Sequence, residues 1–78
     1  MSSKNKISIL LPVYNEEDNL PIIVPLIMKH LNIIKSSEKS LIYEIIIIES
    51  NSTDNSKFIA NQFKSKYEDK IVKLLDCS

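Results

Sequence analysis

The sequence contains no glycine among its 78 residues. Glycine is the usual residue at positive φ and wherever the backbone must approach a phosphate closely. A glycine-rich phosphate loop of the dinucleotide-binding or Walker type is therefore excluded. Any nucleotide that this chain binds must be held in another way.

Cysteine is also rare, and the sequence has neither an excess of charge of one sign nor long apolar runs. Cys77 is the only cysteine, which excludes an intrachain disulfide and leaves no thiolate cluster for zinc. Lys and Arg total 10 and Asp and Glu total 10, with no long run of one sign, so electrostatic capture of nucleic acid has no support. We expect no signal peptide and no transmembrane segment, because the start of the chain is polar and the apolar runs are short.

Three short apolar runs predict β-strands. The first is Ile7–Val13 and the last is Ile71–Leu75. Between them, Leu41–Ile48 contains four consecutive isoleucines, and these β-branched side chains suit a strand that is covered on both faces.

Apolar residues spaced three or four apart predict a helix between the first two strands, over Leu20–Ile34. Asn19 is the expected N-cap, and Pro21 falls in the first turn, where its missing N–H costs little. Pro25 is less compatible with a helix. It predicts either a kink or a regular helix that begins nearer Val24.

A second helix is predicted between the last two strands. Ser52 or Asp54 can cap its start, and the helix should end near Tyr67. Its inward stripe would consist of Ile59, Phe63 and Tyr67.

The order β-α-β-α-β predicts an α/β fold with a parallel sheet. Right-handed crossovers then place both helices on one face and leave the other face bare. Because Ile45–Ile48 is apolar on both sides, we expect something beyond this chain to cover the second face. The pattern is typical of the first half of a domain, with a disordered N-terminus at residues 1–5 and a partial domain at 6–78.

Each of the first two predicted strands ends in a loop of acidic and small polar residues. The carboxyl ends of neighbouring parallel strands are where α/β sheets bind nucleotides. The carboxylates of Glu16 and Glu49 can accept hydrogen bonds from base N–H groups or ribose hydroxyls, and Tyr14 can stack on a base. In an alternative interpretation, the acidic residues only favour a helix N-terminus and Tyr14 only packs on the helix.

Three segments carry a resemblance to a known family: LPVYNE at Leu11–Glu16, NLP at Asn19–Pro21 and YEIIII at Tyr43–Ile48. Together they resemble the start of the dolichyl-phosphate mannosyltransferases, which belong to the inverting glycosyltransferase family 2 and have the GT-A fold. The resemblance runs from about Lys6 to the end of the chain. It implies that residues 6–78 are the nucleotide-binding half of a GT-A domain, without the metal-binding Asp-x-Asp motif.

The resemblance also implies a ligand and its contacts. Pro12, Tyr14 and Glu16 would contact the guanosine part of GDP-mannose. Ile47 would line the base pocket, and Glu49 would replace an aspartate that hydrogen-bonds the nucleoside. None of the residues in this chain would be catalytic or bind a metal.

In the complete enzyme, the resemblance implies transfer of mannose to dolichyl phosphate, for glycan and GPI-anchor precursors. The cofactor would be Mg²⁺ or Mn²⁺, with small membrane-anchoring subunits as partners. The location would be the cytosolic face of the endoplasmic reticulum membrane. The chain alone is expected to be inactive.

The second loop departs from the family pattern. The family has Asp-Asp-Gly-Ser-x-Asp-Gly-Thr where this chain has ESNSTDNS at Glu49–Ser56. Glu49 adds a methylene, and Ser50 removes a charge. Asn51 and Asn55 replace glycines and are the next best residues at positive φ, where we expect them.

Other functions stay open. The chain could be a non-catalytic nucleotide-binding remnant, or part of a family 2 enzyme with another polyprenyl-phosphate or sugar-nucleotide substrate. It could also be an unrelated α/β module such as a receiver domain. That reading would need Glu49 as phosphoacceptor, although a glutamate mimics phosphate rather than accepting it.

Overall fold

The computed structural model describes residues 5–67 and 71–76. Its elements, in chain order, are β1 (Lys6–Val13), α1 (Leu20–Ser37), β2 (Ile42–Glu49), α2 (Ser56–Lys66) and β3 (Val72–Asp76). The predicted order β-α-β-α-β is confirmed. Apart from Asn5, the predicted disordered N-terminus lies outside the described residues, as does Cys77.

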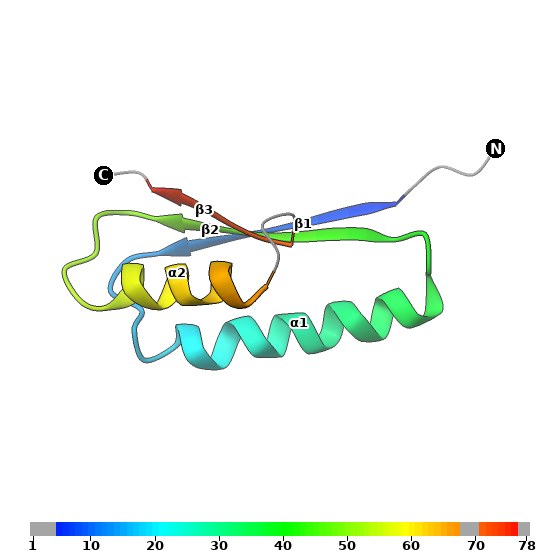
Figure 1. Cartoon of the computed structure of the whole chain (residues 1–78), viewed down its shortest axis with the longest axis horizontal. Helices are drawn as coiled ribbons and strands as arrows, with labels where there is room; N and C mark the ends of the chain where they lie inside the picture. The colour runs from blue at the N-terminus through cyan, green and yellow to red at the C-terminus, as the bar shows by residue number, and fades with distance from the viewer. Residues whose placement is uncertain (1–4, 68–70, 77–78) are drawn as a thin grey trace.

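The three strands form one parallel sheet in the order β1-β2-β3 (Figure 1). Val13 at the end of β1 lies opposite Glu49 at the end of β2, which in turn lies opposite Asp76 in β3. The carboxyl ends of all three strands therefore meet at one end of the sheet.

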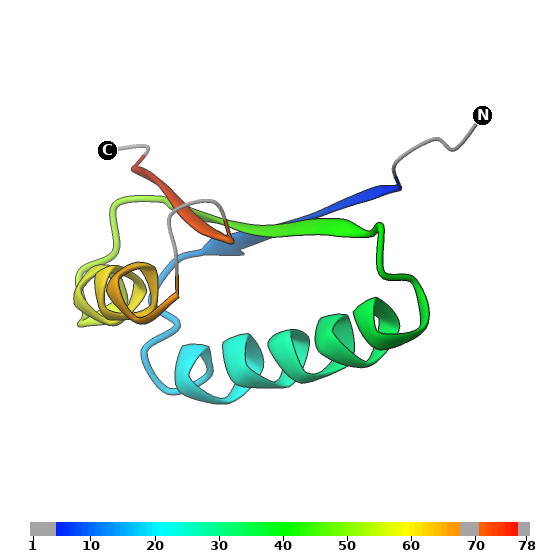
Figure 2. The same ribbon diagram turned by 45° about the vertical axis from the view of Figure 1, so that its right-hand side comes forward.

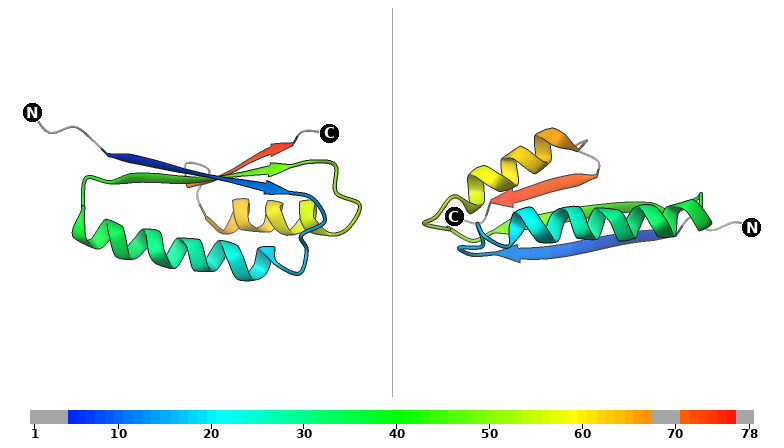
Figure 3. Two further views of the ribbon diagram at one scale, coloured as in Figure 1. Left: turned by 180° about the vertical axis from the view of Figure 1, so that it is seen from behind. Right: turned by 90° about the horizontal axis from the view of Figure 1, so that it is seen from below.

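Both helices lie on the same side of the sheet (Figures 1, 2 and 3), as the right-handed crossovers predict. The core lies between this helical layer and the sheet. Its buried apolar residues are Val13, Leu20, Val24, Met28, Leu31, Ile45, Ile47, Ala60 and Val72.

The first helix begins at Leu20 and runs through Pro25 to Ser37, so of the two predicted alternatives, a kink or a later start, the later start near Val24 is wrong. Pro25 removes one backbone hydrogen bond, and burial of Val24 and Met28 near it offsets that loss. Asn19 occupies the N-cap position, as predicted, but its side chain makes no cap hydrogen bond.

The second helix begins at Ser56, whose N–H donates to Asp54 Oδ1 at 2.9 Å. The N-cap position is occupied by Asn55, without a side-chain cap hydrogen bond, so the prediction of Ser52 or Asp54 at this position is wrong, although Asp54 accepts the first N–H of the helix. The predicted stripe packs half-buried against the core, and Ala60 beside it is fully buried.

No described element covers the other face of the sheet. Side chains alternate between the two faces along each strand, which places Leu10, Ile46, Ile48 and Leu75 on this open face. Leu10 and Leu75 are 60% and 52% exposed. The predicted apolar groups on a bare face are therefore present.

A charged cluster lies on the same open face around Glu44, which is largely buried. Its carboxylate accepts hydrogen bonds from Lys73 Nζ at 2.7 Å and Ser8 Oγ at 2.6 Å, and Lys6 Nζ lies 3.4 Å away. The hydrogen bond from Lys73, followed by that from Ser8, lowers the pKa of Glu44 to about 2. The carboxylate therefore stays ionised on a face that is otherwise largely apolar.

Pro12 lies inside β1, at a position where its missing N–H does no harm. The carbonyls of Asn5 and Val13 accept hydrogen bonds from Ile42 and Ser50 N–H, each at 2.9 Å. Backbone groups point alternately to the two sides of a strand, so the odd-numbered residues of β1 face β2. Pro12 consequently faces the free edge, where a strand tolerates proline.

Candidate functional site

Two loops lie side by side at the carboxyl ends of the strands (Figures 1 and 3). The first loop is Tyr14–Asn19, between β1 and α1. The second loop is Ser50–Asn55, between β2 and α2. Parallel pairing of β1 with β2 brings them together, as the sequence predicts.

The backbone of the first loop donates three hydrogen bonds to side chains of the second loop and the start of α2. The N–H of Asn15 donates to Ser52 Oγ at 2.9 Å. The next two N–H groups donate to Ser56 Oγ at 2.6 Å and Asp54 Oδ2 at 3.2 Å. These bonds join residues 37 to 40 positions apart, so the two loops are held as one unit.

Asn15 also binds the second loop through its side chain. Its Oδ1 accepts the Thr53 N–H at 2.8 Å, the Asp54 N–H at 3.3 Å and the Thr53 hydroxyl at 3.3 Å. Its backbone has φ of 52°, in the left-handed region.

Glu49 is 1% exposed and lies on the face of the sheet that the helices cover. Its Oε2 accepts the Asn51 N–H and its Oε1 accepts the Ser52 N–H, both at 2.9 Å. Asn51 has φ of 62°, as predicted. Asn55 has φ of −86°, so its predicted positive φ is wrong.

Asp54 connects both loops to α2. Its two oxygens accept the N–H groups of Ser56 and Glu17. Burial alone would raise the pKa of Asp54, but the hydrogen bonds from Ser56 and the Glu17 N–H lower it below its ordinary value. The carboxylate that joins the loops is therefore ionised at neutral pH.

The five predicted ligand contacts lie in different environments. Pro12 and Glu16 come together in a small pocket of about 120 Å³, whose other walls are Leu11, Val13, Asn19, Leu20 and Ile23. Tyr14, which lies between Pro12 and Glu16 in the sequence, is 60% exposed. Ile47 and Glu49 are fully buried. Contact of these residues with a nucleotide remains a prediction.

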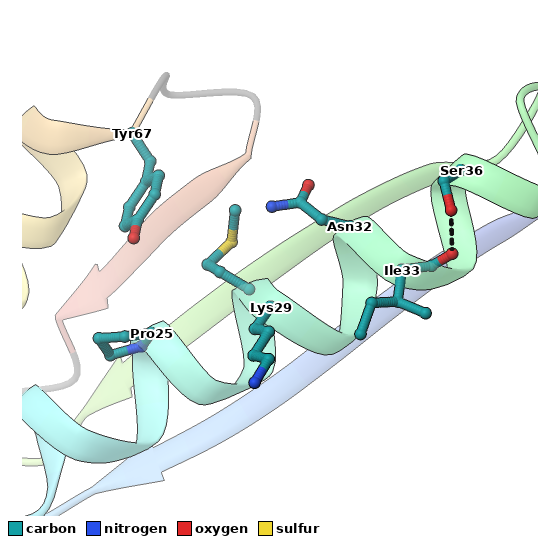
Figure 4. A pocket seen from close by; sticks show the side chains of 7 residues that line it. Pro25, Lys29, Asn32, Ile33, Ser36 and Tyr67 are labelled. Atoms are coloured by element: carbon teal, nitrogen blue, oxygen red, sulfur yellow. Dashed lines mark hydrogen bonds between the residues drawn. The ribbon is translucent and has the colours of Figure 1, made fainter.

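That pocket is smaller than the roughly 300–1,000 Å³ typical of sites that enclose a whole small-molecule ligand. A larger hollow of about 530 Å³ lies along α1 (Figure 4), lined by Pro25, Met28, Lys29, Asn32, Ile33, Ser36 and Tyr67. Figure 4 shows the Ser36 hydroxyl donating to the Ile33 carbonyl, at 2.7 Å. The larger hollow includes no residue of either loop.

Within residues 5–67 and 71–76, no group of three or more His, Cys, Asp or Glu side chains is placed to hold a metal ion. The Mg²⁺ or Mn²⁺ that the family resemblance implies for the complete enzyme stays a prediction. No helix in the same part of the chain is both long and apolar enough to cross a membrane.

Sequence reasoning missed the residues that join the loops: Asn15, Ser52 as an acceptor, and Ser56. One signal was available for Asn15. In a chain without glycine, an asparagine two residues after the end of a strand is a good candidate for a left-handed turn. The serine acceptors carry no comparable local signal.

Comparison with known proteins identifies the family. Residues 8–78 match Glycosyl transferase family 2. Over 68 residues, 86% of this chain, the sequence is 43% identical to a poly(ribitol-phosphate) beta-glucosyltransferase of Bacillus spizizenii. Over 74 residues, 95% of this chain, it is 26% identical to the dolichyl-phosphate beta-glucosyltransferases of Homo sapiens and Mus musculus.

The chain spans 10% of the Bacillus protein and 23% of each mammalian protein. These relatives are glucosyltransferases by name, so the predicted resemblance holds for the family and not for mannosyltransferases in particular. The three-stranded parallel sheet with its alternating helices is consistent with the Rossmann-like N-terminal region of that family. This chain belongs to glycosyltransferase family 2.

Proposed function

We propose that this chain binds the nucleoside part of a sugar nucleotide, within a glycosyltransferase that acts on a polyprenyl phosphate. One observation carries the proposal. In a family 2 chain, two hydrogen-bonded loops meet at the carboxyl ends of β1 and β2, which is where α/β sheets bind nucleotides.

The loops suit a nucleoside better than a phosphate because most of their backbone donors are already paired. The N–H groups of Asn15, Glu16 and Glu17 donate to Ser52, Ser56 and Asp54. Those of Asn51, Ser52 and Thr53 donate to Glu49 and Asn15. At the start of α1, the Leu20 N–H donates to the Glu16 carbonyl, and Pro21 has no N–H. An incoming anion would find few free amides there.

The side chains of the loops point to the same ligand. Glu16, Glu17, Asp18 and Asp54 make the loops acidic, and neither loop contains a cation. Carboxylates repel phosphate but accept hydrogen bonds from base N–H groups and ribose hydroxyls. We therefore propose that residues outside those described hold the diphosphate, together with the Mg²⁺ or Mn²⁺ of the complete enzyme.

Two donors follow from different observations. The LPVYNE and YEIIII segments support GDP-mannose, with dolichyl phosphate as acceptor at the cytosolic face of the endoplasmic reticulum. The mammalian relatives are named for glucosyl transfer to dolichyl phosphate, which supports a glucose nucleotide with the same acceptor. Membrane-anchoring subunits remain a prediction.

A second candidate acceptor comes from the Bacillus relative, which has the higher identity of 43%. Its name specifies transfer of glucose to poly(ribitol phosphate). Under this alternative the nucleoside loops would keep the same role, and only the acceptor would differ. A measurement of donor binding therefore tests the role of the nucleoside loops, which is the same for both acceptors.

Titration calorimetry of the 78-residue chain with GDP, UDP, guanosine, uridine and inorganic pyrophosphate tests the proposal. We expect one nucleotide to bind, its nucleoside to keep most of the affinity, and pyrophosphate not to bind. A preference for GDP would favour GDP-mannose as the donor, and a preference for UDP would favour the glucose nucleotide. Absence of nucleotide binding, or equal binding of pyrophosphate, would contradict the proposal.

Replacement of one carboxylate sharpens the experiment. Glu16→Ala should weaken nucleotide binding by about 1–3 kcal/mol, because a donor on the ligand loses its acceptor. Asp18→Ala is the matched control, since Asp18 is an exposed acidic residue of the same loop that does not line the pocket. Equal losses in both variants would indicate a general charge effect instead of a contact with Glu16.

A further inference from the structure

Asn15 combines two properties that few residues can provide together. Its backbone is left-handed, with φ of 52°, and its side-chain oxygen accepts hydrogen bonds from Thr53 and Asp54. Glycine satisfies the first requirement but has no acceptor. Among the standard residues, asparagine and aspartate meet both requirements best, because they tolerate this region and carry a short side-chain oxygen.

Asn51 provides an internal comparison. It is the other non-glycine residue with positive φ among those described, with φ of 62°. Its N–H donates to Glu49, but no hydrogen bond involves its side chain in the described structure. Asn51 therefore meets a conformational requirement only, whereas Asn15 also joins two segments of the chain.

The hydrogen bonds that Asn15 makes to the second loop form a bridge between the two loops, and the position of Asn15 links this bridge to the predicted ligand contacts. Tyr14 and Glu16 are its immediate neighbours, and both are predicted to contact the nucleoside. The Asn15 N–H, fixed on Ser52 Oγ at 2.9 Å, and its side chain, fixed on the second loop, hold the backbone between those two residues. Loss of the side-chain acceptor would loosen the first loop, which the backbone hydrogen bonds of Asn15, Glu16 and Glu17 would then hold alone, while leaving the apolar core unchanged.

We propose that Asn15 is a positioning residue for nucleotide binding, which locks the first loop to the second and thereby orders Tyr14 and Glu16 before the ligand arrives. This inference rests on the proposed function. A loop that is already ordered loses less conformational entropy on binding, so affinity should depend on the bridge even though Asn15 itself need not touch the ligand.

Three variants of the 78-residue chain test this role. Asn15→Gly keeps the left-handed backbone and removes the acceptor. Asn15→Asp keeps both properties and serves as the conservative rescue. Asn51→Gly makes the same chemical change at the position without a bridge. Affinity for GDP and UDP is measured by calorimetry, at a temperature where circular dichroism shows each protein to be fully folded.

We expect Asn15→Gly to weaken binding of the preferred nucleotide by about tenfold or more, the factor that loss of acceptors for loop amides implies. Asn15→Asp should stay within about threefold of the original, and Asn51→Gly should change little. Hydrogen exchange at the Thr53 and Asp54 amides of the free proteins should be faster in Asn15→Gly alone.

The outcomes separate this inference from the function on which it rests. If the unchanged chain binds neither nucleotide, the proposed function fails and the positioning role fails with it. If the unchanged chain binds but Asn15→Gly binds equally well, only the positioning role is overturned. Equal losses in Asn15→Gly and Asn51→Gly would also overturn it, since a general effect of glycine on the loops would then explain both.

Discussion

Two glutamates on the same strand are held in opposite ways. Glu44 lies on the open face of the sheet, where Lys73, Ser8 and Lys6 surround its carboxylate. Glu49 lies on the helix-covered face, where the backbone N–H groups of Asn51 and Ser52 bind its two oxygens. Both are buried, at 6% and 1% exposure.

The difference shows how each face of the sheet stabilises a buried carboxylate. On the open face, long lysine side chains reach the carboxylate from solvent, and the arrangement is a cluster of charges. On the covered face, backbone N–H groups bind the carboxylate of Glu49, which thereby shapes the backbone of the second loop. Glu44 is therefore expected to govern the response to pH, and Glu49 the geometry of the candidate site.

The largest expected effect comes from neighbouring isoleucines on the two faces. Ile45→Asp puts an unpaired charge into the fully buried core and should lower the free energy of unfolding by more than about 4 kcal/mol. Ile46→Asp puts the same charge on the open face, opposite Lys73, and should change it by less than about 1 kcal/mol. Urea denaturation followed by circular dichroism measures both.

The same pair tests the bare face. Ile46→Asp should also raise solubility and reduce binding of a hydrophobic dye, because it interrupts the exposed apolar surface. Similar destabilisation by both substitutions would show that the second face is as well covered as the first, and the comparison between the faces would then fail.

A smaller effect is expected at Glu49. Glu49→Ala leaves two loop N–H groups without an acceptor and should lower the free energy of unfolding by about 2–3 kcal/mol. Hydrogen exchange at the Asn51 and Ser52 amides should accelerate as well. Retention of slow exchange at these two amides in the variant would contradict the assigned role of the carboxylate.

The smallest effect concerns acid. The pKa of Glu44 is lowered from 4.5 to about 2, so the folded protein takes up this proton less readily than the unfolded chain. Its contribution is complete above pH 4.5 and is lost as the pH falls towards 2, so stability should decrease over that range. Thermal unfolding at stepped pH measures the slope.

Glu44→Gln supplies the control for this pH dependence. The slope of the variant should be shallower, while a residual slope remains from Asp54, whose pKa is also lowered. Parallel pH profiles for the variant and the original chain would show that the lysine cluster contributes nothing to acid stability.

The sheet and its helices could be predicted because their signals are local. Leu41–Ile48 is a β-branched run, and the spacing of apolar residues shows the two helices directly. The sequence was a poorer guide to which apolar side chains of the first helix are buried. Met28 is in the core and Ile34 is 45% exposed, because the rotation of α1 against the sheet decides which apolar side chains face inward.

The candidate site was predictable in place but not in detail. Strand ends located the two loops, since parallel strands bring their carboxyl ends together. The bridge through Asn15 joins residues 37 to 39 positions apart and depends on how the loops meet in space. For the same reason the sequence did not show that Asn15 has positive φ and Asn55 does not.

Pro12 has a consequence for any strand that might add to the sheet beside β1. An incoming strand could accept N–H bonds from Lys6, Ser8 and Leu10, whose backbone groups face the free edge, but none from Pro12. Pairing would therefore weaken at the carboxyl end of β1, and a neighbouring strand is free to diverge there. A missing donor of this kind makes the edge of a sheet a poorer template for another strand, so Pro12 weakens edge-to-edge pairing at the carboxyl end of β1.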